Sequence, residues 1–170
     1  MSSASWQDHL RQTIALVQRS KQPPRVAVVG IGHELCGDDG AGIAVARGLQ
    51  QRQCEGDRIL VIDAGPSPEN SSGLLRRFAP DLVLLVDAAQ VDAAPGTVCW
   101  LDWRDTLGFG ASTHTLPLRI YATYLTAELG CEVAMLGIQP AVLTVDSPLS
   151  PLVKTAVATV AKALVKELSL

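Results

Sequence analysis

Short apolar runs alternate along the chain with segments in which apolar residues recur every three or four positions. Continuous Val, Ile and Leu runs are typical of strands that are buried on both faces of a parallel sheet. The second pattern is typical of helices that bury one side. The predicted strands cover residues 25–30, 58–63, 82–86, 97–101 as an edge strand, and 133–138.

The helical periodicity lies between and after these strands. It predicts helices over residues 39–51, around residues 74–78, from 117 to 130, and from 151 onward. Strands that alternate with helices in this way indicate an α/β fold. We therefore predict a single-domain, mainly parallel twisted sheet of about five strands with helices on both faces.

An additional helix precedes this pattern. Ser5 and Asp8 have the spacing of a capping box, and apolar residues then recur on one helical face. The prolines at positions 23 and 24 end the helix because proline has no amide hydrogen to donate. We expect residues 1–24 to form an N-terminal helical extension that packs on the domain formed by residues 25–170.

The apolar share of the sequence is high, at 48% of 170 residues. A membrane-spanning helix needs about 20 consecutive apolar residues, and the sequence contains no such run, so buried strands explain this share better. The net charge is −3, and lysine and arginine are scattered. A nucleic-acid-binding protein would show a basic face. We therefore predict neither membrane insertion nor nucleic-acid binding.

The cysteines and the first residues bear on the compartment. Cys36, Cys54, Cys99 and Cys131 form no Cys-x-x-Cys pair, and residues 1–19 lack the apolar core of a secretory signal. Scattered cysteines in such a chain indicate reduced thiols. We therefore expect a cytoplasmic location.

Polar side chains follow the predicted strands at their carboxyl ends. Asp38 and Asp39 follow the first strand, Asp63 ends the second, Asp87 follows the third, and His114 begins the helix after the fourth. Functional groups of parallel α/β sheets gather beyond the carboxyl ends of the strands. We therefore expect these side chains to meet at one edge of the sheet.

Each of these residues also has an ordinary explanation. Asp39 is a favoured helix N-cap, a carboxylate such as Asp87 can accept loop hydrogen bonds, and His114 can cap a turn. Together, Asp39, Asp87 and His114 form a nitrogen and oxygen donor set that suits zinc, nickel or manganese. Three protein ligands would leave positions open for another molecule. His33, at the end of the first strand, is a possible fourth contributor.

A nucleotide site is a weaker interpretation. Gly30 and Gly32 follow a strand as in a dinucleotide fingerprint, but the third glycine is misplaced. The acidic pair Asp38 and Asp39 would also repel a pyrophosphate at a helix start. The sequence contains no phosphate loop, no His-Glu-x-x-His and no Gly-x-Ser-x-Gly. A nucleotide-binding α/β domain therefore stays a less favoured alternative.

Several short motifs in a fixed order resemble the [NiFe]-hydrogenase maturation endopeptidases. They are Gly30-x-Gly32 with Gly37-Asp-Asp-Gly40, Val61-Ile-Asp-Ala-Gly65 with Pro68-Glu-Asn70, Val86-Asp-Ala88, Thr113-His114-x-x-Pro117 and Leu136-Gly-Ile-Gln-Pro140. The Pro-Glu-Asn and Gly-Ile-Gln-Pro segments look most like the branch that serves formate-hydrogenlyase-type hydrogenases. The resemblance spans about residues 26–140.

This resemblance implies an aspartyl-type endopeptidase that removes the C-terminal extension of a hydrogenase large-subunit precursor after nickel insertion. It places Asp39, Asp87 and His114 at positions that contact nickel, with nickel presented by the precursor rather than permanently bound. Asp39 would be the catalytic residue, as a general base.

Asp38, Asp63 and His33 are additional candidate site residues, and the family commonly has Asn where this chain has His33. The principal alternative function is a metal-binding accessory protein for hydrogenase assembly that does not cut the precursor.

Overall fold

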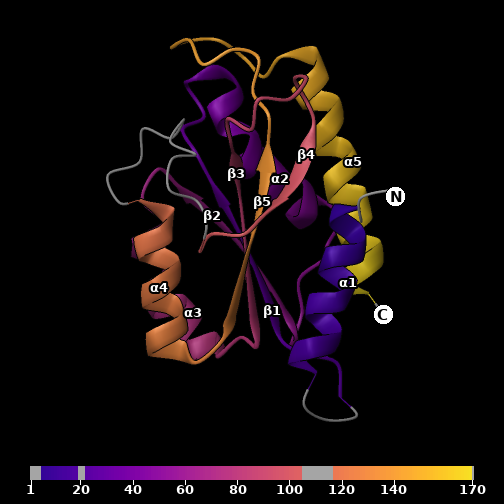
Figure 1. The fold of residues 1–170 in the computed structure, drawn as a ribbon, viewed down its shortest axis with the longest axis vertical. Helices are drawn as coiled ribbons and strands as arrows, with labels where there is room; N and C mark the ends of the chain where they lie inside the picture. Colours follow the sequence, from indigo (N-terminus) through magenta and orange to yellow (C-terminus); the bar gives the residue numbers. More distant parts are fainter. Residues whose placement is uncertain (1–4, 19–21, 105–116, 170) are drawn as a thin grey trace.

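A computed structural model describes residues 5–18, 22–104 and 117–169 of the protein. Within these residues, five strands form one sheet in the order β2-β1-β3-β5-β4 (Figure 1). β4 pairs antiparallel with β5 at one edge, and the other neighbours pair parallel. The predicted mainly parallel sheet is thus confirmed. The strands are β1 (Val26–Ile31), β2 (Ile59–Gly65), β3 (Leu82–Ala88), β4 (Val98–Leu101) and β5 (Glu132–Ile138).

Helices cover both faces of this sheet, as predicted (Figure 1). Alternate residues of the central strands face two separate apolar clusters. One cluster includes residues of α1, α2 and α5, and the other includes residues of α3 and α4. The helices are α1 (Trp6–Val17), η1 (Gly37–Gly40), α2 (Ala41–Gln51), η2 (Pro68–Ser71), α3 (Ser72–Phe78), α4 (Leu118–Leu129) and α5 (Pro151–Leu168), where η marks a 3-10 helix.

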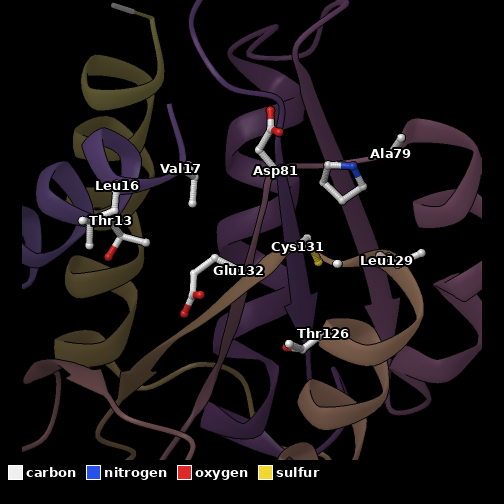
Figure 2. Close-up of a pocket in the computed structure, with 11 residues that line it drawn as sticks. Thr13, Leu16, Val17, Ala79, Asp81, Thr126, Leu129, Cys131 and Glu132 are labelled. Carbon is white, nitrogen blue, oxygen red and sulfur yellow. The ribbon is translucent and has the colours of Figure 1, made fainter. Parts of the chain in front are cut away.

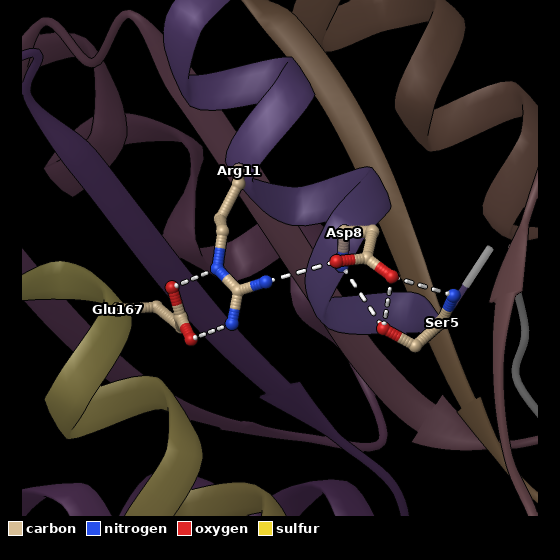
Figure 3. A network of polar contacts seen from close by, with 4 residues as sticks. All are labelled: Ser5, Asp8, Arg11 and Glu167. Carbon is tan, nitrogen blue, oxygen red and sulfur yellow. Dashed lines mark hydrogen bonds and ion pairs between the residues drawn. The ribbon is translucent and has the colours of Figure 1, made fainter.

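The N-terminal helix α1 is fixed to the C-terminal helix α5. The predicted capping box is present, because Ser5 Oγ accepts the Asp8 N–H and Asp8 Oδ2 accepts the Ser5 N–H. Arg11 donates from Nε and Nη2 to the two carboxylate oxygens of Glu167 on α5, at 2.8 and 2.6 Å (Figure 3). Leu10 is fully buried in the first cluster. Apolar burial and a bidentate ion pair together hold α1 against the domain.

The start of α2 differs from the prediction. The helix predicted to begin at Asp39 begins at Ala41, and residues 37–40 form the 3-10 helix η1. Gly40 occupies the N-cap position of α2 and no side chain caps it. The alternative that Asp39 serves as the N-cap is therefore wrong, because its carboxylate accepts a hydrogen bond from the His33 N–H instead.

The described residues contain no helix that is long and apolar enough to cross a membrane. The loops that follow β1 and β5 lie at the same end of the sheet, at the top of Figure 1. Asp38 and Asp39, which follow β1, therefore lie at this carboxyl edge (Figure 1).

Candidate functional site

Close backbone packing brings η1 and α2 onto the ends of β1 and β3. A Cβ atom on Gly42 would collide with the carbonyl oxygens of Val86 and Ile31. Gly32 has a φ of +144°, and a Cβ atom there would collide with the Asp39 carbonyl oxygen. Only glycine allows this approach. Gly32, one of the two glycines that suggested a nucleotide loop, therefore lets the Asp39 backbone lie against the end of β1.

Asp38 is fully buried and its carboxylate is saturated with hydrogen bonds. Oδ2 accepts the N–H groups of Ala141 and Val142 at 2.8 and 2.9 Å and the Ser150 hydroxyl at 2.8 Å. Oδ1 accepts the Ser150 N–H at 2.6 Å. Burial is the largest influence and raises the pKa of Asp38, but these bonds outweigh it and the pKa lies below its ordinary value. Asp38 thus holds the loop between β5 and α5.

Asp39 is also buried, at 3% exposed, but its carboxylate is differently occupied. Its Oδ2 accepts the His33 N–H at 2.9 Å. Among the described residues, Oδ1 accepts no hydrogen bond. A carboxylate oxygen without a protein partner is a candidate to bind a cation or a water molecule. The Asp38 carboxylate is therefore fully hydrogen-bonded within the protein, whereas the Asp39 carboxylate has one oxygen without a protein partner among the described residues.

Asp87 lies within β3, one residue before its end, and is 4% exposed. Its Oδ1 accepts the N–H of Ala88 at 2.8 Å. The strand register places Val86 beside Gly30 of β1 and Asp87 beside Gly137 of β5. Because η1 contacts β3, the segments that carry Asp39 and Asp87 touch at the carboxyl edge. The structure therefore brings these two predicted residues to the same place.

His33 and Asp63 line a small surface cavity of about 160 Å³ beside η1. His33 Nδ1 accepts the Leu35 N–H at 3.4 Å. Asp63 Oδ2 accepts Arg47 Nε–H at 2.7 Å, and Arg47 Nη1 donates to Glu34 Oε2 at 2.6 Å. These contacts, the one with Glu34 first, raise the pKa of Arg47. Asp63 is thus paired with the guanidinium group of Arg47. The backbone N–H of His33, by contrast, binds the Asp39 carboxylate.

Sequence reasoning did not single out Arg47 or Glu34. Arg47 lies on α2 only eight positions after Asp39, and it is a charged residue within a largely apolar helix. That signal was available, but its two acidic partners lie on separate segments of the chain. Only the fold shows that Arg47 joins them.

His114 lies outside the described residues, so its position relative to Asp39 and Asp87 stays a prediction. Within the part of the chain that the structure describes, no group of three or more His, Cys, Asp or Glu side chains is arranged to hold a metal ion. The predicted donor set needs His114 as its third member. The two described members are therefore part of a candidate site rather than a complete one.

A larger cavity of about 610 Å³ lies at the opposite end of the sheet, where the strands begin (Figure 2). Asp81 and Glu132 line it, but both are already engaged. Asp81 Oδ2 accepts the Arg25 N–H at 2.8 Å, and Glu132 Oε1 accepts a hydrogen bond from Arg104 at 3.1 Å. These contacts give the acidic groups a structural role. The carboxyl edge therefore remains the better candidate for chemistry.

The fold and the buried carboxylates define an α/β protein with acidic groups at the carboxyl edge of a parallel sheet, a usual place for enzyme sites. The chain belongs to the hydrogenase maturation protease family, whose model matches residues 43–167. It is therefore an endopeptidase, a hydrolase. The family predicted from the motifs is confirmed.

Known relatives support this assignment over most of the chain. The hydrogenase 3 maturation protease of Escherichia coli K12 is 35% identical over 131 residues, which cover 76% of this chain and 82% of the relative. The crystal structure of the [NiFe] hydrogenase maturation protease HycI from Thermococcus kodakarensis has a TM-score of 0.80 and 31% identity. The matched region covers 92% of this chain and 99% of the chain in that crystal structure.

The solution structure of the endopeptidase HycI from Escherichia coli has a TM-score of 0.72 and 33% identity, covering 81% of this chain and 87% of its own. These relatives are consistent with the formate-hydrogenlyase-type branch that the Pro-Glu-Asn and Gly-Ile-Gln-Pro segments indicated.

Proposed function

We propose that this endopeptidase removes the C-terminal extension from the large-subunit precursor of a [NiFe] hydrogenase after nickel has been inserted. The names of its relatives support a hydrogenase substrate and a maturation step. The observation that carries the site assignment is the contrast between two neighbouring carboxylates. Asp38 is saturated by four hydrogen bonds, whereas Asp39 keeps one oxygen for a ligand.

In this proposal, Asp39, Asp87 and His114 contact nickel that arrives with the precursor. Oxygen and nitrogen donors of this kind suit a divalent transition metal. Because the ion belongs to the substrate, the empty enzyme needs no complete metal centre of its own. Nickel then acts as the recognition signal, and a precursor without it presents nothing for these side chains to bind.

Asp39 serves as the general base of an aspartyl-type hydrolysis. Its carboxylate takes a proton from a water molecule, and the hydroxide adds to the carbonyl carbon of the scissile amide. The tetrahedral intermediate then breaks its C–N bond, and the amine leaves with the proton that Asp39 returns. The His33 N–H holds Oδ2, so that Oδ1 is the oxygen left for nickel or for the attacking water.

Intact mass spectrometry of the purified precursor, nickel-loaded and nickel-free, tests the proposal. With the nickel-loaded form we expect two products whose masses add up to the precursor plus one water. The nickel-free form should stay intact. Equal cleavage of both forms would refute nickel recognition. Binding without any change of mass would instead support the accessory-protein alternative.

We also propose a cytoplasmic location. All four cysteines, Cys36, Cys54, Cys99 and Cys131, are free thiols. Burial raises the pKa of Cys131 to about 11, so that this thiol is unreactive near neutral pH. Free thiols of this kind are typical of a reducing compartment.

A further inference from the structure

Four large apolar side chains are exposed at the carboxyl edge of the sheet. They are Leu35, which follows β1, and Val142, Leu143 and Val145 in the loop after β5, with exposed fractions of 55%, 37%, 43% and 64%. We call these four residues the apolar rim. The other exposed large apolar side chains among the described residues lie on helices, one or two on each. Neighbouring exposed apolar groups usually mark a binding surface.

Hydrogen bonds hold the two segments of the apolar rim together. The Leu35 carbonyl accepts the Asp146 N–H at 2.7 Å, and the Val142 carbonyl accepts the Asp38 N–H at 2.7 Å. The Asp38 carboxylate binds the Val142 N–H as well. Because these bonds fix the backbone on both sides, the apolar side chains cannot turn into the core without breaking them. Their exposure is therefore built into the loop structure.

The apolar rim also borders the proposed catalytic carboxylate. Leu35 is two positions after His33, whose N–H holds Asp39, and Val142 is bound by Asp38, the neighbour of Asp39. An endopeptidase has to hold its substrate chain on both sides of the scissile bond. An extended chain advances about 3.3 Å per residue, so substrate residues within a few positions of that bond are within reach of the rim.

Some of the charges next to the apolar rim are already engaged, whereas Asp146, beside Val145, is exposed. Arg47 binds Glu34 and Asp63, and Asp38 is saturated by backbone and hydroxyl donors. Apolar contact is therefore the interaction that the four rim side chains themselves offer. We propose that the apolar rim binds apolar side chains of the precursor segment that flanks the scissile bond. This inference rests on the proposed function.

Steady-state processing of the nickel-loaded precursor by Leu35→Ser/Val145→Ser tests the inference. We expect KM to rise about tenfold while kcat stays within about twofold, because the lost contact holds the ground state and the transition state equally. Leu35→Met, which keeps an apolar side chain of similar volume, should raise KM less than Leu35→Ser does. The single serine variants should each raise KM by about threefold, and they replace the double variant if it does not fold.

Leu16→Ser is the matched control. Leu16 is 83% exposed on α1 and lines the cavity at the opposite end of the sheet (Figure 2). We expect this variant to process the precursor with wild-type KM. A wild-type KM for Leu35→Ser/Val145→Ser overturns the inference, as does an equal rise of KM in Leu16→Ser. If the double variant instead changes only the sedimentation coefficient, the rim is a contact between two copies and the inference fails. If the wild-type protein leaves the nickel-loaded precursor intact, the proposed function itself has failed.

Discussion

The replacement Asp38→Asn tests whether Asp38, unlike the adjacent Asp39, stabilises the fold. An Asn side chain can keep its oxygen at the Oδ2 position, where it accepts from Ala141, Val142 and the Ser150 hydroxyl. Its amide nitrogen then occupies the Oδ1 position, 2.6 Å from the Ser150 nitrogen, which is also a donor. One charge-assisted bond is thereby lost and two donors face each other.

The expected loss follows from these bonds. A hydrogen bond to a charged group contributes about 1.5–3 kcal/mol, and the three retained bonds weaken because a neutral acceptor replaces a carboxylate. We therefore expect the free energy of unfolding to fall by about 2–4 kcal/mol. For a domain of this size about 1 kcal/mol lowers the unfolding temperature by roughly 2–4 °C, so the midpoint should fall by roughly 4–16 °C.

Urea unfolding followed by circular dichroism measures this loss, with an unchanged m-value as evidence that the same surface is exposed. Asp39→Asn is the matched control, because its side-chain oxygen can still accept the His33 N–H. We expect a loss below about 1 kcal/mol for this control. If Asp38→Asn and Asp39→Asn lose stability equally, Asp38 does not hold the loop in the way its hydrogen bonds indicate.

Three further predictions concern activity and pH. Asp39→Asn, Asp87→Asn and His114→Ala should each lower processing of the nickel-loaded precursor by at least about 100-fold with little loss of fold; a variant that processes normally removes its residue from the site. His33→Asn should keep kcat/KM within about twofold, because the bond to Asp39 comes from the backbone N–H; a large loss would show that the imidazole itself takes part. The folded-state pKa of Asp38 is lowered, so its stabilisation is complete above the unfolded pKa of about 3.9 and is lost as the pH falls through the folded pKa. The stability difference between wild type and Asp38→Asn should therefore be constant from pH 7 to about pH 5 and shrink below about pH 4; urea titrations at each pH would contradict this if the difference did not change.

The strands could be predicted from sequence because burial on both faces leaves a continuous apolar run. The segment 82–86 is the clearest example, and every residue of β3 is buried. The start of α2 could not be predicted as well. Local preference favours an aspartate as N-cap, but contacts with His33 and with residues 141–150 determine where the side chains of Asp38 and Asp39 lie. Tertiary hydrogen bonds thus overrode a local signal.

The position of Asp39 and Asp87 at one edge could be predicted, since carboxylates at the ends of parallel strands meet there. The different roles of Asp38 and Asp39 could not be predicted from the sequence. The partners of Asp38 lie more than 100 positions away in the sequence, and no local pattern connects them. The pairing of Asp63 with Arg47, 16 positions away, likewise depends on the placement of α2 beside β2.

The 3-10 helix η1 explains how adjacent aspartates serve different purposes. Successive residues of a 3-10 helix are turned by about 120°, so the Asp38 and Asp39 side chains leave the backbone in different directions. Four donors surround the charge of Asp38, which weakens its repulsion of a second carboxylate. The Asp39 carboxylate is then left to serve as the proposed base. The same bonds fix Val142 in the apolar rim. Asp38 therefore contacts neither the substrate nor the attacking water in this proposal. It instead supports the proposed base, Asp39, and holds Val142 of the apolar rim in place.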